Sequence, residues 1–231
     1  MDQFFSTTTT IDAFLPPHWF RLVSYGLLAL VIYLCVNYHK KTWLKRFFFV
    51  FQVIQLIGLY GFYWIQGLPL SVSLPLYHCR IAMFVLLLKK EYSFKKYFAL
   101  IGIFGCLSAI FFPIMDKYAW PHVTLVSFYW GHLALLGNSL IYLLEHQQQI
   151  KVQTIVTITV AMNSGIALAN QLTGGSYGFL NETPMIAHWP FLARFFVISV
   201  VLVLVVTFFQ WFIAQIQQAV VSRKEKSVFG N

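Results

Sequence analysis

Three side chains with chemical potential occupy consecutive positions in the apolar segment LPLYHCRIAMF (74–84). They are His78, Cys79 and Arg80. A cysteine thiolate is a nucleophile when a base or a positive charge lies nearby, and Arg80 would supply that charge. Consecutive helical residues point about 100° apart, so the three cannot all face one partner. A free cysteine is also often a small buried apolar residue, which leaves a structural role for Cys79 open.

A further histidine, His132, lies in the apolar segment FYWGHLALLGNSLIYLL (128–144). In a membrane, such a residue serves either as a general base or as a hydrogen-bonding bridge between helices. Polar side chains in hydrocarbon need polar company. We therefore expect the segments 74–88 and 122–144 to pack together and to bring His132 towards Cys79, with Cys79 in the outer half of the membrane.

Other polar residues of the apolar segments could line a cavity or hold a headgroup. Arg80 and Arg194 are expected near the outer membrane surface, where a guanidinium binds phosphate with two parallel hydrogen bonds or simply reaches the interface. Tyr77, Asn163 and Asn170 are predicted to line a polar cavity, although intramembrane amides often only join helices. No His- or carboxylate-based ligand motif occurs in these segments, so we predict no metal and no cofactor.

The elements that carry these residues are long apolar stretches, because a membrane span needs about 20 such residues. The sequence predicts an all-α bundle of seven membrane helices that forms a single domain over residues 1–231. Residues 1–18 form an outer N-terminal segment and residues 216–231 a cytoplasmic tail. The predicted spans are 19–37, 47–66, 74–88, 97–114, 122–144, 152–172 and 189–215. The third is short if it starts at Leu74, so a start nearer Leu68 is the alternative.

Composition and charge set the protein class and the orientation. Hydrophobic residues make up 59% of the chain and charged residues 10%, which excludes an ordinary soluble domain. Most of the Lys and Arg residues fall in 40–46, 89–96, 151 and 223–226, all on one side of the predicted bundle. The positive-inside rule then places the N-terminus outside and the C-terminus in the cytoplasm, and the net charge of +9 does not indicate nucleic acid.

Three segments together resemble a known family, the YwaF-like bacterial integral membrane proteins. They are 74–84, 128–144 and SYGFLNETP (176–184), followed by Trp189-Pro190. A eukaryotic branch of that family includes a transmembrane acyltransferase that remodels ether phospholipids. Family members usually carry a histidine two residues after the proline of the first motif, where this chain has Tyr77. Cys79 and His132 match family positions.

This resemblance implies a phospholipid acyltransferase of the cell membrane that acts from an outer-leaflet cavity. Cys79 would accept the acyl group, with His132 or His78 as the base and Arg80 as a headgroup or oxyanion partner. The alternative is a non-enzymatic protein that binds lipid or stabilises a partner complex. A retinal protein is excluded because 189–215 contains no lysine, and a transporter is disfavoured because no internal repeat is visible. Membrane lipids are the expected partners, and the sequence does not indicate an oligomeric state.

Overall fold

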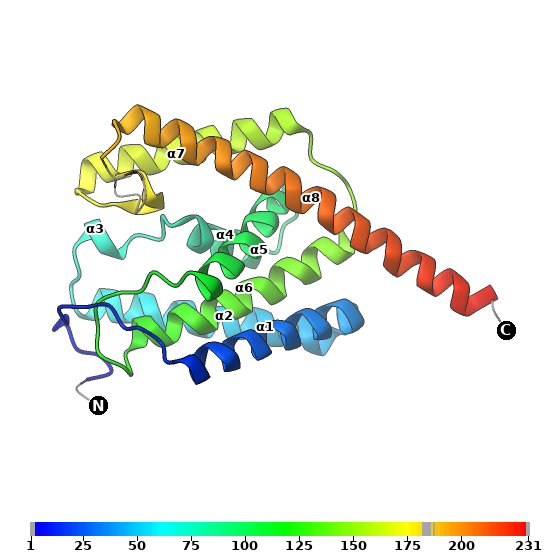
Figure 1. The fold of residues 1–231 in the computed structure, drawn as a ribbon, viewed down its shortest axis with the longest axis horizontal. Coiled ribbons are helices and arrows are strands. Elements are labelled where there is room, and N and C mark those ends of the chain that lie inside the picture. Colours follow the sequence, from blue (N-terminus) through cyan, green and yellow to red (C-terminus); the bar gives the residue numbers. More distant parts are fainter. Residues whose placement is uncertain (1–2, 182–185, 187, 230–231) are drawn as a thin grey trace.

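The computed structural model describes residues 3–181, 186 and 188–229, and the regular elements of this part are all helical (Figure 1). Six long helices coincide with predicted spans, because long apolar runs define them. The elements are α1 (His18–Tyr38), α2 (Thr42–Ile65), α3 (Leu70–Ser73), α4 (His78–Leu87), α5 (Lys95–Phe111), α6 (Val123–Glu145), α7 (Val152–Thr173), the 3-10 turn η1 (Tyr177–Phe179) and α8 (Phe191–Phe229).

The centre of the bundle is the pair α5 and α6, which pack together along their lengths. On one side of this pair, α6 contacts α1 and α2. On the other side, α5 contacts α4 and α8, and α8 in turn packs against α7 (Figure 1). Small residues allow the central helices to approach closely. A Cβ on Gly102 of α5 would be only 3.0 Å from Leu135 Cδ1 of α6 and would overlap the Ser139 hydroxyl.

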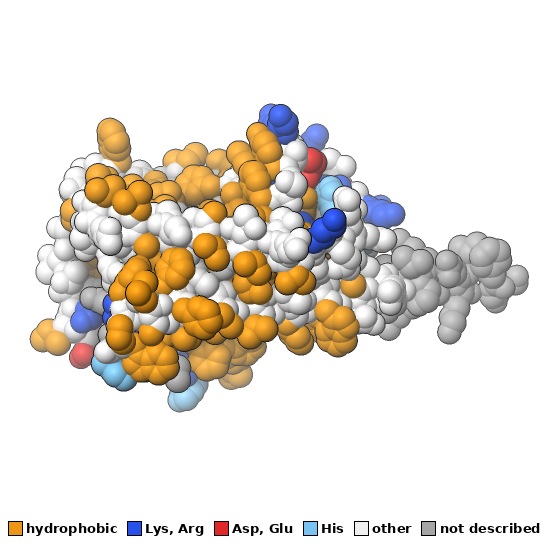
Figure 2. All heavy atoms as spheres, turned by 90° about the horizontal axis from the view of Figure 1, so that it is seen from above, with side chains coloured by type: hydrophobic (Ala, Val, Ile, Leu, Met, Phe, Trp, Pro, Cys, Tyr) orange, Lys and Arg blue, Asp and Glu red, His pale blue; other side chains and the backbone are white. Residues whose placement is uncertain are grey.

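The surface of the bundle is apolar, as expected of a membrane protein. Four described helical stretches are long and apolar enough to cross a bilayer: α1, α2, α7 and the Phe191–Gln218 part of α8. Large apolar side chains such as Trp64 and Leu172 are 88% and 78% exposed. Figure 2 shows apolar side chains over most of one face, with most of the visible Lys and Arg side chains towards one end. We call the end that carries Lys45, Arg46 and loop 88–94 the basic end.

The third predicted span is broken rather than continuous. After the single turn of α3, Leu74 and Tyr77 are extended, and α4 begins only at His78. The prediction of a helix that starts at Leu74 is therefore wrong. The physical reason is Pro75, which has no N–H to donate and disfavours helical backbone at the preceding residue. Tyr177, from η1, supplies hydrogen-bond partners for backbone groups of this segment. Its hydroxyl accepts a hydrogen bond from Leu74 N at 2.9 Å and donates one to Leu70 O at 2.6 Å.

The last helix is longer than the predicted span 189–215. α8 continues to Phe229 through residues that the sequence analysis assigned to a tail (216–231). Its continuation QQAVVSRKEKSVF contains good helix formers and neither glycine nor proline. The apolar stretch therefore ends well before the helix does.

Candidate functional site

Cys79 lies at the N-terminus of a helix that begins inside the bundle. Tyr77 is the extended N-cap residue of α4, so Cys79 belongs to the first helical turn. The first N–H groups of a helix have no partner within it, and they form the positive end of the helix dipole. Cys79 packs against α5 at Gly105, where a Cβ would be 3.1 Å from the Cys79 Cβ. Gly105 lies ten residues from the start of α5 at the basic end and six from its other end, about 15 and 9 Å. Cys79 therefore packs against the half of α5 that lies away from the basic end, and its place in the outer half of the membrane stays a prediction.

Arg80, the next residue, is surrounded by tyrosines. Its guanidinium lies 5.9, 5.6 and 5.5 Å from the ring centres of Tyr60, Tyr63 and Tyr77, which we call the tyrosine cage. Both terminal nitrogens also donate to the Tyr63 hydroxyl, at 3.3 and 3.2 Å. In the part of the chain that the structure describes, Arg80 makes no ion pair with a carboxylate. A guanidinium held over three rings keeps its full positive charge inside the bundle.

The hydroxyl of Tyr60 is a buried polar group of the tyrosine cage. It has no hydrogen-bond partner among the described residues. The Tyr60 ring is fixed by edge contacts with Tyr63 and Phe84, at 5.6 and 5.5 Å between ring centres. The Arg80 guanidinium lies against this hydroxyl without the geometry of a standard hydrogen bond, and Cys79 lies within electrostatic range of it. Because a guanidinium only donates, the proton of the Tyr60 hydroxyl has no acceptor among the described residues, and this hydroxyl can act as a donor near the cysteine.

His132 is held in the form that a general base requires. Its Nδ1 lies 2.6 Å from the Phe128 carbonyl oxygen one turn earlier in α6. A carbonyl only accepts, so Nδ1 carries the proton and Nε2 keeps its lone pair. No hydrogen bond occupies Nε2 within the described part of the chain, and Arg80 lies within electrostatic range of the ring.

The predicted packing of these two segments is present, since α4 contacts α6 as well as α5. The two reacting groups are nevertheless not joined: among the described residues, no hydrogen bond links Cys79 to His132. Catalytic hydrogen bonds often tighten only when substrate is bound. In the same residues, no group of three or more His, Cys, Asp and Glu side chains is placed to hold a metal ion.

His78 points to a different part of the bundle. Its Nε2 lies 2.8 Å from Asn163 Oδ1 of α7, and Asn163 Nδ2 donates to Ser199 Oγ of α8 at 2.9 Å. This chain of hydrogen bonds ties α4 to α7 and α8. Both side chains therefore join helices in this structure. The role of His78 as a base and that of Asn163 in lining a cavity stay predictions.

The remaining predicted residues flank the loop before α8. Asn170 closes that loop: its amide accepts from Tyr177 N at 2.8 Å and donates to Tyr177 O at 3.0 Å. Tyr77 stacks edge-on against Tyr177 and so connects the loop to the tyrosine cage. Arg194 lies in the first turn of α8. Pro184, the end of the predicted SYGFLNETP pattern, is outside the described residues.

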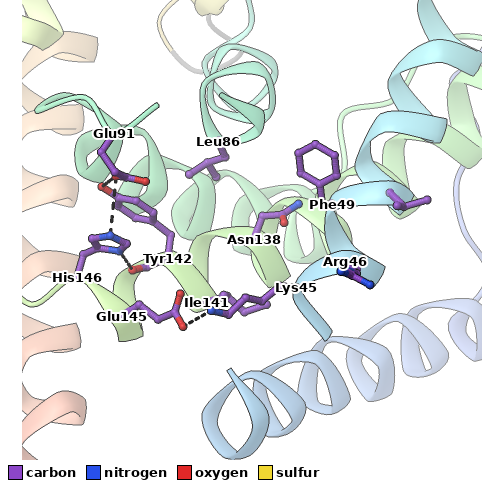
Figure 3. Close-up of a pocket in the computed structure, with 11 residues that line it drawn as sticks. Lys45, Arg46, Phe49, Leu86, Glu91, Asn138, Ile141, Tyr142, Glu145 and His146 are labelled. Carbon is purple, nitrogen blue, oxygen red and sulfur yellow. Dashed lines mark hydrogen bonds and ion pairs between the residues drawn. The ribbon is translucent and has the colours of Figure 1, made fainter. Parts of the chain in front are cut away.

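A cavity that Cys79 does not line lies at the basic end (Figure 3). It has a volume of about 340 Å³ and is lined by residues of α2, α4, α6 and the loop after α4. The sequence alone does not predict this cavity, because its walls come from three segments that lie far apart in the chain. Tyr60 and Tyr63 were also missed, since tyrosines near the end of an apolar span are ordinarily interfacial aromatics.

Comparison with known families supplies the identity. The model of the TMEM164 family matches residues 13–222, nearly the whole chain. The chain belongs to the TMEM164 family. Neither the curated proteins nor the solved structures include a significant match. Membership of this transmembrane family agrees with the membrane protein that the sequence predicted, and it extends over every residue of the candidate site.

Proposed function

We propose that this TMEM164-family protein is a multi-pass phospholipid acyltransferase of the cell membrane. In the proposed topology seven segments cross the bilayer, counting α3 and α4 as one broken span, with the N-terminus outside and the basic end in the cytoplasm. The observation that carries the proposal is the start of α4 inside the bundle. Short helices that begin within a membrane commonly point their N-termini at anionic ligands, and here that N-terminus carries Cys79 and Arg80.

The proposed reaction has two acyl-transfer steps. In the first, the Cys79 sulfur attacks the ester carbonyl of a donor phospholipid while His132 Nε2 takes the thiol proton. The ester C–O bond breaks, and the imidazolium returns the proton to the departing lysophospholipid oxygen. In the second, the hydroxyl of another lysophospholipid loses its proton to His132 and attacks the thioester. The C–S bond breaks, and the cysteine recovers the proton. Atoms and charges balance without a cofactor.

Charge develops on the carbonyl oxygen in both steps, and donors aimed at it lower the barrier. The donors available around Cys79 are the Tyr60 hydroxyl, the Arg80 guanidinium and the N–H groups at the start of α4. Arg80 also suits the phosphate of the substrate, because a guanidinium binds phosphate with two parallel hydrogen bonds. The tyrosine cage then serves to hold that guanidinium in one place.

Lipidomics on whole cells tests the proposal. A strain that lacks the protein and a strain with Cys79→Ala should show the same shift in the acyl composition of one phospholipid class. Cys106→Ala is the matched control, because Cys106 is a buried cysteine of the neighbouring helix α5. It should leave the lipids unchanged. A Cys79→Ala strain with wild-type lipids and normal protein levels would refute the enzyme and favour the lipid-binding or complex-stabilising alternative.

The Arg80→Lys variant tests the role assigned to the charge. Lysine keeps the charge but loses the planar fork, so acyl transfer should fall sharply while expression stays normal. Arg194→Lys, in the first turn of α8, provides the comparison. Equal tolerance at both positions would remove Arg80 from the mechanism.

A further inference from the structure

The turn formed by residues 177–180 lies against the start of α4. The Phe179 ring contacts the Tyr77 ring, at 6.2 Å between ring centres and 61° between ring planes. The neighbouring Gly178 is so close to His78 that a Cβ on this glycine would be 3.1 Å from the His78 Cε1 atom. The turn therefore covers the residues through which the chain enters α4.

The covered residues belong to the candidate site. The Tyr77 ring is one wall of the tyrosine cage, with its centre 5.5 Å from the Arg80 guanidinium, and Tyr77 precedes Cys79 by two positions. Cys79 and Arg80 are half-buried, whereas the Phe179 side chain is 37% exposed. A lipid that approaches Arg80 from the side of this turn therefore meets the Phe179 ring first.

Phe179 has a backbone conformation that a bulky residue disfavours. Its φ is +60°, and in the part of the chain that the structure describes it is the one non-glycine residue with a positive φ. Left-handed backbone brings the Cβ atom close to the following carbonyl oxygen. Such outliers persist where the surrounding structure imposes them, and they cluster at ligand clamps and switch regions.

The surrounding structure fixes both ends of the turn. The side chains of Tyr177 and Leu180 are fully buried. Asn170 holds Tyr177 through hydrogen bonds to its backbone N–H and carbonyl groups, and Leu180 N donates to Tyr177 O at 3.4 Å to close the turn. A change of conformation is therefore confined to the two central residues, Gly178 and Phe179.

Two types of turn fit between these ends. The φ values of Gly178 and Phe179, 65° and 60°, are both positive, which is the pattern of a type I′ turn. A type II′ turn needs a positive φ only at its first central residue, and its second has a φ of about −80°. Rotation of the peptide group between Gly178 and Phe179 converts one type into the other. This rotation relieves the strain at Phe179 and carries its ring off Tyr77.

We propose that the turn 177–180 is a two-state lid over the candidate site. In the type I′ state the Phe179 ring lies on Tyr77 and closes this route to Cys79 and Arg80. In the type II′ state the ring leaves Tyr77, and a phospholipid headgroup reaches Arg80. The ring contact in one state offsets the relief of strain in the other. The lid rests on the proposed function in taking Cys79 as the reacting residue, but its test does not need the reaction.

Alkylation of Cys79 by N-ethylmaleimide tests the lid in the purified full-length protein without lipid substrate. Peptide mass spectrometry reads the rate at each cysteine separately. The minor state of such an equilibrium is populated to about 0.1–10%, so Phe179→Gly, which removes the ring, should raise the rate at Cys79 at least tenfold. Phe179→Tyr keeps the ring and should react at the wild-type rate. Phe112→Gly is the matched control, because Phe112 is an exposed phenylalanine that directly follows α5 at the end of the bundle away from the basic end.

Three outcomes of this experiment would overturn the lid. They are equal rates at Cys79 in the wild type and Phe179→Gly, an equal rise in Phe112→Gly, and a parallel rise at the fully buried Cys106, which would indicate a general opening of the bundle. Faster alkylation of Phe179→Gly together with unchanged lipids in the Cys79→Ala strain would leave the lid without the acyltransferase. Failure of the lid and failure of the proposed function are therefore distinguishable.

Thermal unfolding of Phe179→Gly and Phe179→Ala tests the strain separately. Both variants lack the ring, but only alanine keeps the penalty of a positive φ. The glycine variant should therefore melt about 2–4 °C higher. At a position with ordinary backbone, glycine is the less stable of the two residues. A higher melting temperature of Phe179→Ala would show that residue 179 is not held in the left-handed region, and it would overturn the proposal.

Discussion

Replacing Tyr60 by phenylalanine separates stability from activity at the candidate site. The Tyr60 hydroxyl is buried and has no partner among the described residues. A buried unpaired polar group costs about 1–3 kcal/mol. Tyr60→Phe removes that group and keeps the ring contacts with Tyr63 and Phe84, so we expect the variant to be about 1 kcal/mol more stable than the wild type.

The same change should impair the reaction. If the hydroxyl donates to the oxyanion of the acyl-transfer intermediate, its loss should lower the turnover rate about 10²- to 10³-fold, as for other single oxyanion donors. Stability is measured by denaturant unfolding of the purified protein in detergent. Activity is measured by mass spectrometry of the transfer of an isotope-labelled acyl chain between phospholipids in vesicles.

Tyr63→Phe is the matched control, because the Tyr63 hydroxyl accepts hydrogen bonds from both terminal nitrogens of Arg80. Hydrogen bonds to charged groups contribute about 1.5–3 kcal/mol, so this variant should be less stable. The two tyrosines thus predict stability changes of opposite sign. Wild-type activity of the Tyr60→Phe variant would refute the role of the hydroxyl as a donor. A loss of stability in this variant would show that the hydroxyl makes a stabilising hydrogen bond in the wild type.

Three further changes test the structure away from the tyrosine cage. Gly102→Ala should destabilise the α5–α6 contact by about 1–3 kcal/mol through overpacking, whereas Gly165→Ala, whose Cβ meets nothing within 4 Å, should be neutral or slightly stabilising in denaturant unfolding. Burial would raise the pKa of Glu91, but hydrogen bonds from Tyr142 and Lys95 outweigh it and lower the pKa from its usual 4.5. The stability that this carboxylate contributes is therefore present above that value and is lost as the pH falls through the lowered pKa. The difference in melting temperature between wild type and Glu91→Gln should accordingly be present at about pH 7 and close below about pH 4; a gap that persists in acid would contradict this assignment. Asn163→Ala should cost about 1–3 kcal/mol by leaving His78 and Ser199 without their partner, and an unchanged unfolding midpoint would show that this connection is not needed.

The sequence predicted most of the helices because an apolar run of sufficient length is a physical requirement for a span. The ranges of α1, α2, α5, α6 and α7 agree with the predicted stretches to within a few residues. The two departures were the extension of α8 beyond residue 215 and the break before α4. Pro75 was the available signal, but a count of apolar residues gives no weight to the missing N–H of a proline.

The site was less predictable because its contacts join distant parts of the chain. Arg80 could be singled out because a charged side chain is costly within a membrane. Cys79 could be singled out because a thiol is a potential nucleophile, and His132 because it lies near the centre of an apolar segment. The residues that contact these side chains and decide their chemistry could not be predicted from the sequence. Tyr60 lies on another helix, and the orientation of His132 follows from its bond to Phe128. His78, adjacent to Cys79 in sequence, points to α7 because consecutive helical residues diverge.

The role of Tyr177 in the broken span has a consequence for the order in which the protein is made. The extended residues before α4 depend on a hydroxyl that lies 103 positions further along the chain. At ribosomal speeds of about 5–20 residues per second, that partner emerges roughly 5–20 s later. Unpaired backbone groups are not tolerated in lipid for that time. In the proposed topology, the nascent segment therefore waits at the membrane surface or in the insertion machinery until the loop before α8 has been synthesised.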